Sequence, residues 1–260
     1  MPAAGRAGAW RRLVYAVCGL SLLPCAAPVG AATVADLLRL IEHAERRYEA
    51  VRDYTSVMVS VERLGDVLQP EKRVLLKFQR PFKVYMRWLE GPGAGREGLY
   101  VAGAHDGKFI VAEAEGIARF VTAALAPDDP RVLEKSRHPV TDVGIGRLLE
   151  IVGENARRGA REHVLRVVDR GVAEIDGRPV HQLEGILPRD PAAGYYGYRV
   201  ILAFDREYGL PTRVVVYDAA DRLVEDYTYL QLRLNAGLTD RDFDRNNPEY
   251  AFARWRLRLP

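Results

Sequence analysis

Near its C-terminal end the chain carries side chains of the type and spacing that bind calcium. The stretch DRDFDRN, residues 240–246, places carboxylate or amide groups at alternate positions, as the first ligands of an EF loop are placed. The rest of that loop is missing, because Arg245 stands where a glycine is needed and Ala251 where a bidentate glutamate is needed. The stretch therefore predicts a capped turn that ends the last strand, and no metal site.

Histidines are the other candidates for metal binding or general base catalysis. The chain has five: His43, His105, His138, His163 and His181. No two of them stand two, three or four residues apart, as ligands on one helix or strand would, so surface or turn positions are expected. The nucleophile elbow, the zinc-protease helix and the phosphate loop are also missing from the sequence. We therefore expect no enzyme and no cofactor; an enzyme built from scattered residues is the alternative.

A group of tyrosines could contact a sugar or a lipid. They come from two strand-like segments: Tyr195, Tyr196, Tyr198, Tyr227 and Tyr229. Tyrosine is also common in strands because its ring packs well on a pleated surface. Binding and ordinary packing are both open interpretations of this group.

Residues 1–31 have the pattern of a secretory signal peptide. Three arginines precede an uncharged run that ends in small residues, which predicts export to the periplasm and cleavage after Ala31 or Ala32. A permanent membrane anchor would need roughly 20 apolar residues, and this run is shorter and interrupted by Pro24. A lipid-modified Cys25 would need a small residue before it, where Pro24 stands.

Removal of the signal peptide changes the composition of the chain. Both cysteines and three of the 38 basic residues leave with it, which makes basic and acidic side chains equal at 35 each. Disulfides, cysteine metal sites and thiol catalysis are therefore excluded for the mature chain. A formal charge near zero, with no dense run of Lys or Arg, argues against a nucleic acid partner. Residues 32–260 are enough for one well-packed domain, which we expect to be monomeric.

Two segments have the spacing of amphipathic helices. The first begins at Thr33, with Asp36 at the capping-box position. Its apolar stripe is Val34, Leu37, Leu38 and Ile41. The second lies in segment 116–160, where the strand period is lost, and Thr141 and Asp142 are its candidate caps. Its apolar stripe is Ile145, Leu148, Leu149 and Val152.

In the remaining segments, apolar residues recur at every second position, as they do in strands. The first rows are Val57, Val59 and Val61, then Val74, Leu76 and Phe78. Two Asp-Gly pairs, at 106–107 and 176–177, indicate hairpin turns. Nine to eleven antiparallel strands are too many for a small flat sheet. We therefore expect a mainly β (α+β) fold, in which a strongly curved antiparallel sheet forms an incomplete β-barrel with helices covering its mouth.

Two strand segments supply the candidate ligand-binding residues. In KFQRPFKVYMRWLEGP, residues 77–92, alternate positions form an apolar row: Phe78, Phe82, Val84, Met86 and Trp88. In YYGYRVILAFD, residues 195–205, a second row shares one face: Tyr196, Tyr198, Val200, Leu202 and Phe204. Side chains on one face of a strand point the same way. We expect the first row, with Tyr198, Val200 and Leu202 of the second, to line an apolar cavity.

Arg80 interrupts the first of these rows. It precedes Pro81, which cannot donate to a sheet ladder, so Arg80 is expected at the rim with its stem on apolar surface. Its guanidinium could then hydrogen-bond the carbonyls at a helix C-terminus, or a carboxylate, and hold the cavity shut. An arginine without a specific partner is the alternative.

Three longer stretches carry a resemblance to a known group of proteins. RPFKVYMRWLEGP, LYVAGAHDGKFIVAEA and FDREYGLPTRVVVYDAADRLVEDYTY together resemble the LolA/LolB-like superfamily of exported lipoprotein carriers. The resemblance spans most of the chain after the signal peptide. It is closer still to an uncharacterised branch of exported bacterial proteins, in which the ending LTDRDFDRNNPEYAF recurs.

The resemblance implies an incomplete barrel whose apolar interior shelters acyl chains beneath a helical lid. In the family, an arginine before a proline at the start of this strand holds the lid closed; the pair here is Arg80 and Pro81. The pair Arg87 and Trp88 comes two residues later than in the family, which leaves the inward face unchanged. The segment 116–160 is longer than in the family, and this affects the shape of the lid and the ligand.

These observations lead to a functional hypothesis with two alternatives. The hypothesis is a periplasmic carrier that binds a lipid, or the acylated end of a lipoprotein, without catalysis. The first alternative is a periplasmic sensor or interaction module on the same fold, which detects a lipid and regulates an envelope membrane protein. The second is an esterase or glycosidase, whose turnover would depend on a single Asp or Glu.

Overall fold

The computed structural model describes residues 32–114, 121–253 and 257–258. The predicted signal peptide, residues 1–31, lies outside the described residues. Among the described residues, no helix is long and apolar enough to cross a membrane.

One antiparallel sheet forms the body of the protein. Its strands are β1 (Asp53–Leu64), β2 (Val67–Leu68), β3 (Lys72–Gln79), β4 (Lys83–Glu90), β5 (Glu97–Val101), β6 (Phe109–Ala112), β7 (Val121–Leu125), β8 (Arg166–Ile175), β9 (Arg178–Ile186), β10 (Arg199–Asp205), β11 (Pro211–Tyr217), β12 (Leu223–Leu234) and β13 (Leu257–Arg258). Their order across the sheet is β13-β7-β6-β5-β4-β3-β1-β12-β11-β10-β9-β8, and β2 pairs with β1 beside this path. Only β13, beside β7, pairs in parallel.

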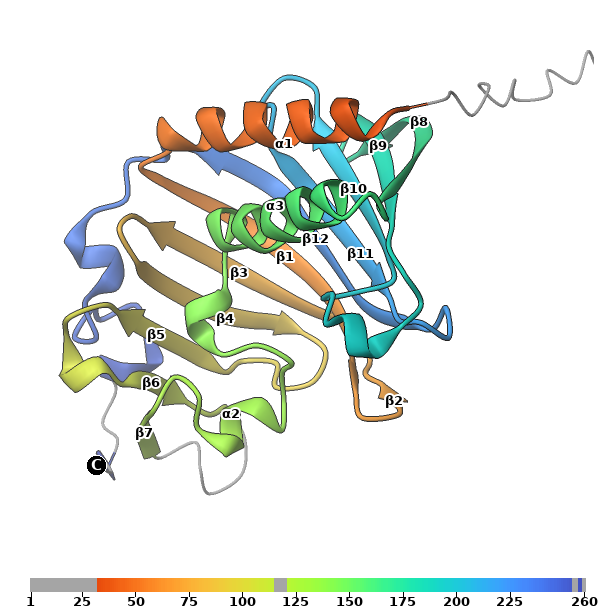
Figure 1. Ribbon diagram of the computed structural model, residues 1–260. Coiled ribbons are helices and arrows are strands. Elements are labelled where there is room, and N and C mark those ends of the chain that lie inside the picture. The colour runs from red at the N-terminus through yellow and green to blue at the C-terminus, as the bar shows by residue number, and fades with distance from the viewer. Residues whose placement is uncertain (1–31, 115–120, 254–256, 259–260) are drawn as a thin grey trace, which may run out of the picture.

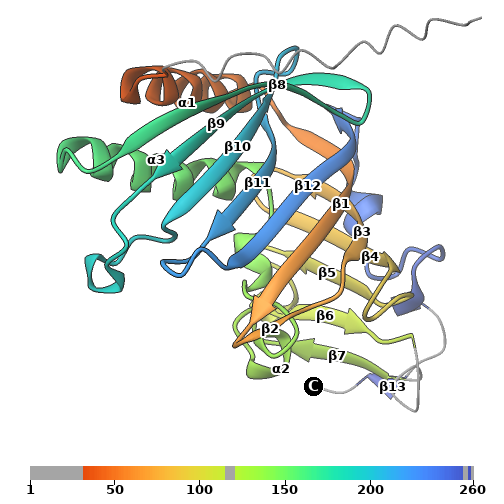
Figure 2. The same cartoon turned by 90° about the vertical axis from the view of Figure 1, so that its right-hand side faces the viewer.

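The sheet is strongly curved and does not close, because β8 and β13 at its two ends do not pair with each other. Figures 1 and 2 show the two halves of the sheet turning about β1 and β12. The expected fold class, an incomplete barrel with covering helices, is therefore confirmed. The strand number was underestimated, because β2 and β13 are only two residues long and β7 lies where helix was expected.

Two long helices cross the concave side of this sheet. They are α1 (Val34–Glu49) and α3 (Ile145–Arg161), and they lie on the same side of the sheet (Figures 1 and 2). The remaining helical segments are short: α2 (Pro130–Leu133) and the 3-10 turns His105–Gly107, Val140–Asp142, Pro191–Ala193, Asp240–Phe243 and Ala251–Ala253.

Helix α1 begins as the sequence predicts. Thr33 Oγ accepts a hydrogen bond from the Asp36 backbone N–H at 3.2 Å, and the Thr33 backbone N–H donates to the Asp36 carboxylate at 2.7 Å. This reciprocal pair satisfies two donors that would otherwise be free at a helix start. Leu37, Ile41 and Ala44 follow at helical spacing and are buried against the sheet.

The start of α3 differs from the sequence prediction. Thr141 and Asp142 lie in the preceding 3-10 turn, and the N-cap is Gly144. Gly144 has φ of +119°, and a Cβ there would lie 2.9 Å from the hydroxyl oxygen of Tyr54. That hydroxyl accepts a hydrogen bond from the Ile145 N–H at 3.1 Å, so a buried strand residue replaces the expected side-chain cap.

The C-terminal tail covers the outer face of the sheet. Phe243, Tyr250 and Phe252 form a second apolar cluster with Tyr85 of β4 and its neighbours, and the rings of Tyr85 and Tyr250 stack with centroids 3.9 Å apart. This is why the first half of β4, Val84 to Met86, is buried on both faces.

The acidic stretch of this tail is a capped turn, as predicted. Thr239 and Asp242 form a capping box. Asp240 and Asp242 pair with Lys83 and Lys77 at 2.6 and 2.8 Å, so these carboxylates fasten the tail to the sheet.

Candidate ligand-binding cavity

A cavity of about 730 Å³ lies between the concave face of the sheet and the helices. Its apolar wall comes from the helices and from both halves of the sheet. The main contributors are Leu37, Met58, Val74, Met86, Trp88, Phe109, Val111, Leu148, Val152, Leu165, Val200, Leu202, Val214 and Val216. The volume falls in the range of roughly 300 to 1,000 Å³ that is typical of small-molecule sites.

Four of the predicted residues line this cavity, and three of the others lie in or against the core without lining it. Met86, Trp88, Val200 and Leu202 are in the wall. Phe78 and Val84 are buried in the same core, and Phe82 packs against it, but none of the three lines the cavity. Phe78 and Phe82 belong instead to a run of aromatic contacts, with Tyr54 and Phe78, Phe78 and Phe82, and Phe82 and Tyr100 at centroid distances of 5.1, 5.3 and 5.8 Å.

Tyr198 is not found in the cavity wall where the sequence placed it, and its contact with a ligand stays a prediction. Strand β10 begins only at Arg199, so the alternation read from the sequence does not extend back to the tyrosines. Tyr198 does not line the cavity, and its ring packs under the Arg189 guanidinium at 4.3 Å. Its neighbour Tyr196 lines the cavity instead.

Arg80 lies in the turn between β3 and β4 and does not line the cavity. Its guanidinium donates hydrogen bonds to the backbone carbonyls of Tyr48, Glu49 and Val51 at 3.3, 2.9 and 3.4 Å, and it lies 5.5 Å from the Tyr48 ring. These carbonyls belong to the C-terminal end of α1 and the residues that follow. The predicted contact with a helix C-terminus is therefore present; its role as a latch stays a prediction.

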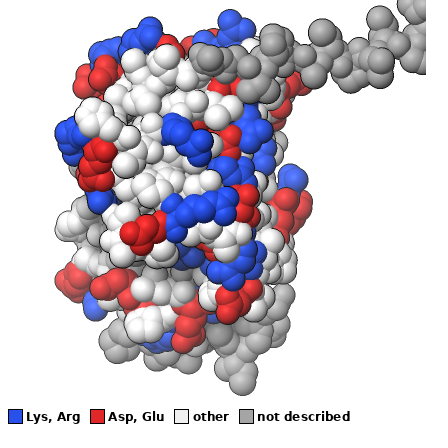
Figure 3. Space-filling model, turned by 45° about the vertical axis from the view of Figure 1, so that its right-hand side comes forward, with Lys and Arg blue, Asp and Glu red and all other residues white. Residues whose placement is uncertain are grey.

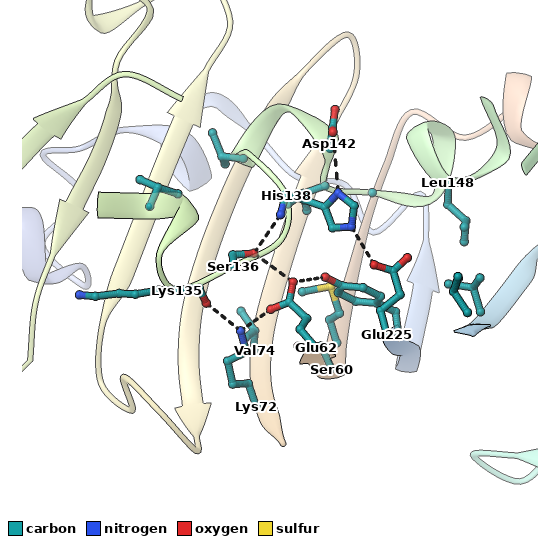
Figure 4. Close-up of a pocket in the computed structure, with 18 of the residues that line it drawn as sticks. Ser60, Glu62, Lys72, Val74, Lys135, Ser136, His138, Asp142, Leu148 and Glu225 are labelled. Atoms are coloured by element: carbon teal, nitrogen blue, oxygen red, sulfur yellow. Dashed lines mark hydrogen bonds and ion pairs between the residues drawn. The ribbon is translucent and has the colours of Figure 1, made fainter. Parts of the chain in front are cut away.

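Part of the wall is made by residues 126–144, which we call the strap. The strap contains α2 and the 3-10 turn Val140–Asp142, and it joins β7 to α3. It contributes Val132, Ser136, His138, Val140 and Val143 to the cavity. Figure 4 shows Ser136 and His138 of the strap directed toward charged side chains of the sheet.

Where the strap meets the sheet, the apolar wall is interrupted by a group of polar residues, which we call the polar cluster. It consists of Glu62, Lys72, Ser136, His138, Tyr196, Glu225 and Tyr227, all of which line the cavity. Glu62 of β1 and Glu225 of β12 are direct partners in the sheet register, and their side chains are only 1 % and 5 % exposed. Two buried carboxylates side by side need compensating partners, and the cluster supplies them.

Glu62 is held by groups from three segments, β3, β12 and the strap. Lys72 Nζ donates to it at 2.5 Å, the Tyr227 hydroxyl at 2.6 Å, and the Ser136 hydroxyl and Arg137 backbone N–H at 3.2 and 3.0 Å. Burial alone would raise the pKa of Glu62, but the charge and hydrogen bond of Lys72, with the other donors, outweigh it and hold the pKa below the usual 4.5. Glu62 is thus ionised at neutral pH.

Glu225 is held by a second set of donors. The Tyr196 hydroxyl donates to it at 2.7 Å, His138 Nε2 lies 2.9 Å away, and Arg137 Nε lies at 3.3 Å. Burial disfavours the charged imidazole, but the hydrogen bond and charge of Glu225 outweigh burial and raise the pKa of His138 above its usual 6.5. Burial together with Glu225 also raises the pKa of Tyr196, so that phenol stays a donor.

Sequence reasoning missed this cluster because it followed the wrong face of β1. The predicted row of Val57, Val59 and Val61 is half-buried, whereas the buried positions of β1 include Met58, Ser60 and Glu62. His138, the histidine of this cluster, lines the cavity, whereas a position at the surface or in a turn was expected. One observation in the sequence could have revealed the cluster. Lys72 lies two residues before Val74, so it shares the face of β3 on which Val74, Leu76 and Phe78 are buried.

Neither metal binding nor a strong surface field is suggested by the described residues. Within 32–114, 121–253 and 257–258, no group of three or more His, Cys, Asp or Glu side chains is placed to hold a metal ion. On the face shown in Figure 3, acidic and basic side chains lie next to one another around a broad uncharged area. This agrees with the near-zero charge of the mature sequence.

Comparison with known proteins places the chain in a family. Residues 51–252 match the family described as "Protein of unknown function (DUF1571)". The chain belongs to the DUF1571 family. This agrees with the uncharacterised branch indicated by the sequence. No curated protein matches the sequence of this DUF1571 protein.

Solved structures with a similar arrangement have low sequence identity to this DUF1571 protein. Lipoprotein LppX from Mycobacterium tuberculosis has 13% identity and a TM-score of 0.48, with 81% of this chain and 99% of that chain covered. LprF from Mycobacterium bovis has 14% identity and a TM-score of 0.47, covering 80% and 97%. The MucA/MucB complex from Pseudomonas aeruginosa gives 16% identity and a TM-score of 0.46, covering 80% and 60%.

The DUF1571 chain spans only about 60% of the length of the MucA/MucB chain that it matches. At such identities and TM-scores the similarity concerns the fold alone and does not bear on what the DUF1571 protein binds.

Proposed function

We propose that the protein is a periplasmic carrier that binds a lipid, or the acylated end of a lipoprotein, in the cavity between sheet and helices, without catalysis. The observation that carries this proposal is the cavity of about 730 Å³ with a largely apolar wall. Each methylene group removed from water contributes about 0.8 kcal/mol. Ten buried methylenes would contribute roughly 8 kcal/mol before the cost of association is subtracted.

The helices supply the second support for the proposal. Leu37 of α1 and Leu148, Val152 and Ala156 of α3 form the cavity roof. Arg157 of α3 pairs with Glu45 of α1 at 3.0 Å, so the two helices are tied to each other. The roof is fastened to the sheet near Arg80, and a lipid would enter when that roof, or the strap, moves away from the sheet.

Native mass spectrometry of the mature protein, purified from the periplasm of its own cells, tests the binding step. We expect a co-purifying species with the mass of an acylated molecule, and its loss after delipidation. Protein that is fully folded and always free of such a species, and that takes up no lipid when it is offered, would contradict the proposal.

Transfer of the bound lipid tests the carrier role against the sensor alternative. The loaded protein is mixed with acceptor vesicles, and the lipid that reaches the vesicles is measured over time. A carrier delivers its lipid to the vesicles or to an envelope partner. A protein that retains its lipid and instead captures an inner-membrane regulator would be a sensor.

A further inference from the structure

The polar cluster is not needed to hold an acyl chain. Buried ion pairs such as Lys72 with Glu62 can often be replaced by apolar residues of the same volume without loss of stability. An apolar wall would also shelter a hydrocarbon chain better. Charged groups in the wall of an apolar cavity are therefore expected where a ligand has a polar part to be oriented.

Two donors of the cluster remain available for such a ligand. Lys72 Nζ donates to Glu62 and to the Lys135 carbonyl at 2.5 and 3.2 Å, and within the described part of the chain its third N–H has no acceptor. The Lys72 side chain is 9 % exposed. His138 uses Nε2 for Glu225, while its Nδ1 is 3.9 Å from Asp142, which is beyond hydrogen-bond distance.

The charges of the cluster are matched, and this restricts the chemistry of the ligand. Glu62 pairs with Lys72, and Glu225 pairs with Arg137 at 3.3 Å. His138 lies between Glu225 at 2.9 Å and Asp142 at 3.9 Å, so three basic groups face three carboxylates. A phosphate or carboxylate placed here would stand beside two buried carboxylates with no unpaired cation to offset it. In a site of low dielectric constant, that repulsion is strong. An uncharged head with oxygen atoms accepts from the free donors without this cost.

We propose that the polar cluster binds the uncharged, hydroxyl-bearing head of a lipid whose acyl chain occupies the apolar part of the cavity. The inference rests on the proposed function and adds the class of ligand. Ester and hydroxyl oxygens of the head accept from Lys72 and from Nδ1 of His138. Hydroxyl groups of the head donate to lone pairs of the Tyr196 oxygen and Glu225, while the rings of Tyr196 and Tyr227 flank it. Acylglycerols and glycolipids share this chemistry.

Displacement of the uncharged fluorescent probe N-phenylnaphthylamine from the delipidated full-length mature protein tests the inference. Four competitors carry the same chain length: methyl myristate, monomyristoylglycerol, its phosphate ester, and tetradecyl glucoside. We expect monomyristoylglycerol, tetradecyl glucoside or both to bind roughly tenfold more tightly than methyl myristate, from one or two added hydrogen bonds. The phosphate ester should bind more weakly than monomyristoylglycerol. Whichever of monomyristoylglycerol and tetradecyl glucoside binds more tightly shows whether the head of the lipid is an acylglycerol or a sugar.

Variants separate recognition of the head from binding of the chain. His138→Phe and Tyr196→Phe should remove most of the tenfold preference, measured in each variant as the ratio of its affinities for monomyristoylglycerol and methyl myristate. Tyr100→Phe, which loses a tyrosine hydroxyl outside the cavity, should keep the preference.

Equal affinity of the wild type for all four lipids, or tighter binding of the phosphate ester, overturns the inference even if both variants fail to fold. Failure of the probe and of every lipid to bind would instead overturn the proposed function. The two failures are thus distinguishable.

Discussion

At the scale of single residues, Met86 best represents the apolar wall. It is 5 % exposed and lies in the cavity wall on β4. Met86→Glu should weaken binding of N-phenylnaphthylamine by roughly tenfold or more, because an isolated buried carboxylate costs several kcal/mol or must stay protonated. A fluorescence titration measures the change, with circular dichroism as the check on folding. Val59→Glu, on the opposite face of β1, is the control; equal losses in both variants would contradict the assignment of the inward face.

His138 gives a prediction about pH. Its pKa in the folded protein is raised above 6.5, so the protonated ring stabilises the fold fully below pH 6.5, and this contribution is lost as pH rises through the raised value. His138→Gln keeps a neutral donor beside Glu225 but cannot become charged. The variant should therefore be less stable than the wild type by about 1 to 3 kcal/mol below pH 6.5, with a smaller difference at pH 9.

Urea denaturation between pH 5.5 and pH 9 measures this difference. The neighbouring groups that face the ring are Glu225, Asp142, Glu62, Arg137 and Tyr196. The pKa of Glu62 is below 4.5, so this carboxylate does not titrate in that interval. A difference in stability that is constant with pH would show that the charge of His138 does not contribute.

At the scale of elements, the contact between Arg80 and the end of α1 decides how firmly the roof is held. Arg80→Leu should leave the fold and the capacity for ligand intact, because Arg80 is exposed and outside the cavity. The closed roof would lose hydrogen bonds from a charged donor, worth roughly 1.5 to 3 kcal/mol. We therefore expect faster hydrogen exchange in α1 and α3, and faster release of ligand.

Hydrogen exchange followed by mass spectrometry, over residues 33–51 and 142–155, measures the opening. Arg87→Leu is a matched control, because Arg87 is an exposed arginine on β4 that alternates with the inward-facing Met86 and Trp88. If protection of both helices and the release rate in Arg80→Leu equal those of the wild type, Arg80 is not a latch.

At the scale of the whole molecule, the predicted signal peptide bears on where the cavity operates. The signal-like residues 1–31 lie outside the described residues, and α1 begins at Val34 directly after its cap at Thr33. We expect the mature protein to begin at Ala32 or Thr33, without a lipid on Cys25. N-terminal sequencing and intact mass of the protein recovered from the periplasm measure this; a chain that starts at an acylated Cys25 would contradict it.

The sequence by itself determined the class of fold and most of its elements. Alternation at Phe82, Val84, Met86 and Trp88 identified an inward face because a strand has a period of two. The capping pair of Thr33 and Asp36 fixed the start of α1 because both partners are local. The turn at Asp176 and Gly177, whose φ values of +55° and +73° suit a tight hairpin, was predictable for the same reason.

Only the tertiary structure decided which residues meet in the cavity. Tyr198 was misplaced because where β10 begins depends on its pairing with β9 and β11 and not on local alternation. Glu62 and Glu225 are 163 positions apart in the sequence, yet they are partners in the register of β1 and β12. A row of polar side chains on one face of a strand normally indicates that this face is exposed to solvent. Here donors from the strap and from β3 satisfy the polar side chains of β1 and β12, and contacts between such distant segments leave no periodic signal in the sequence.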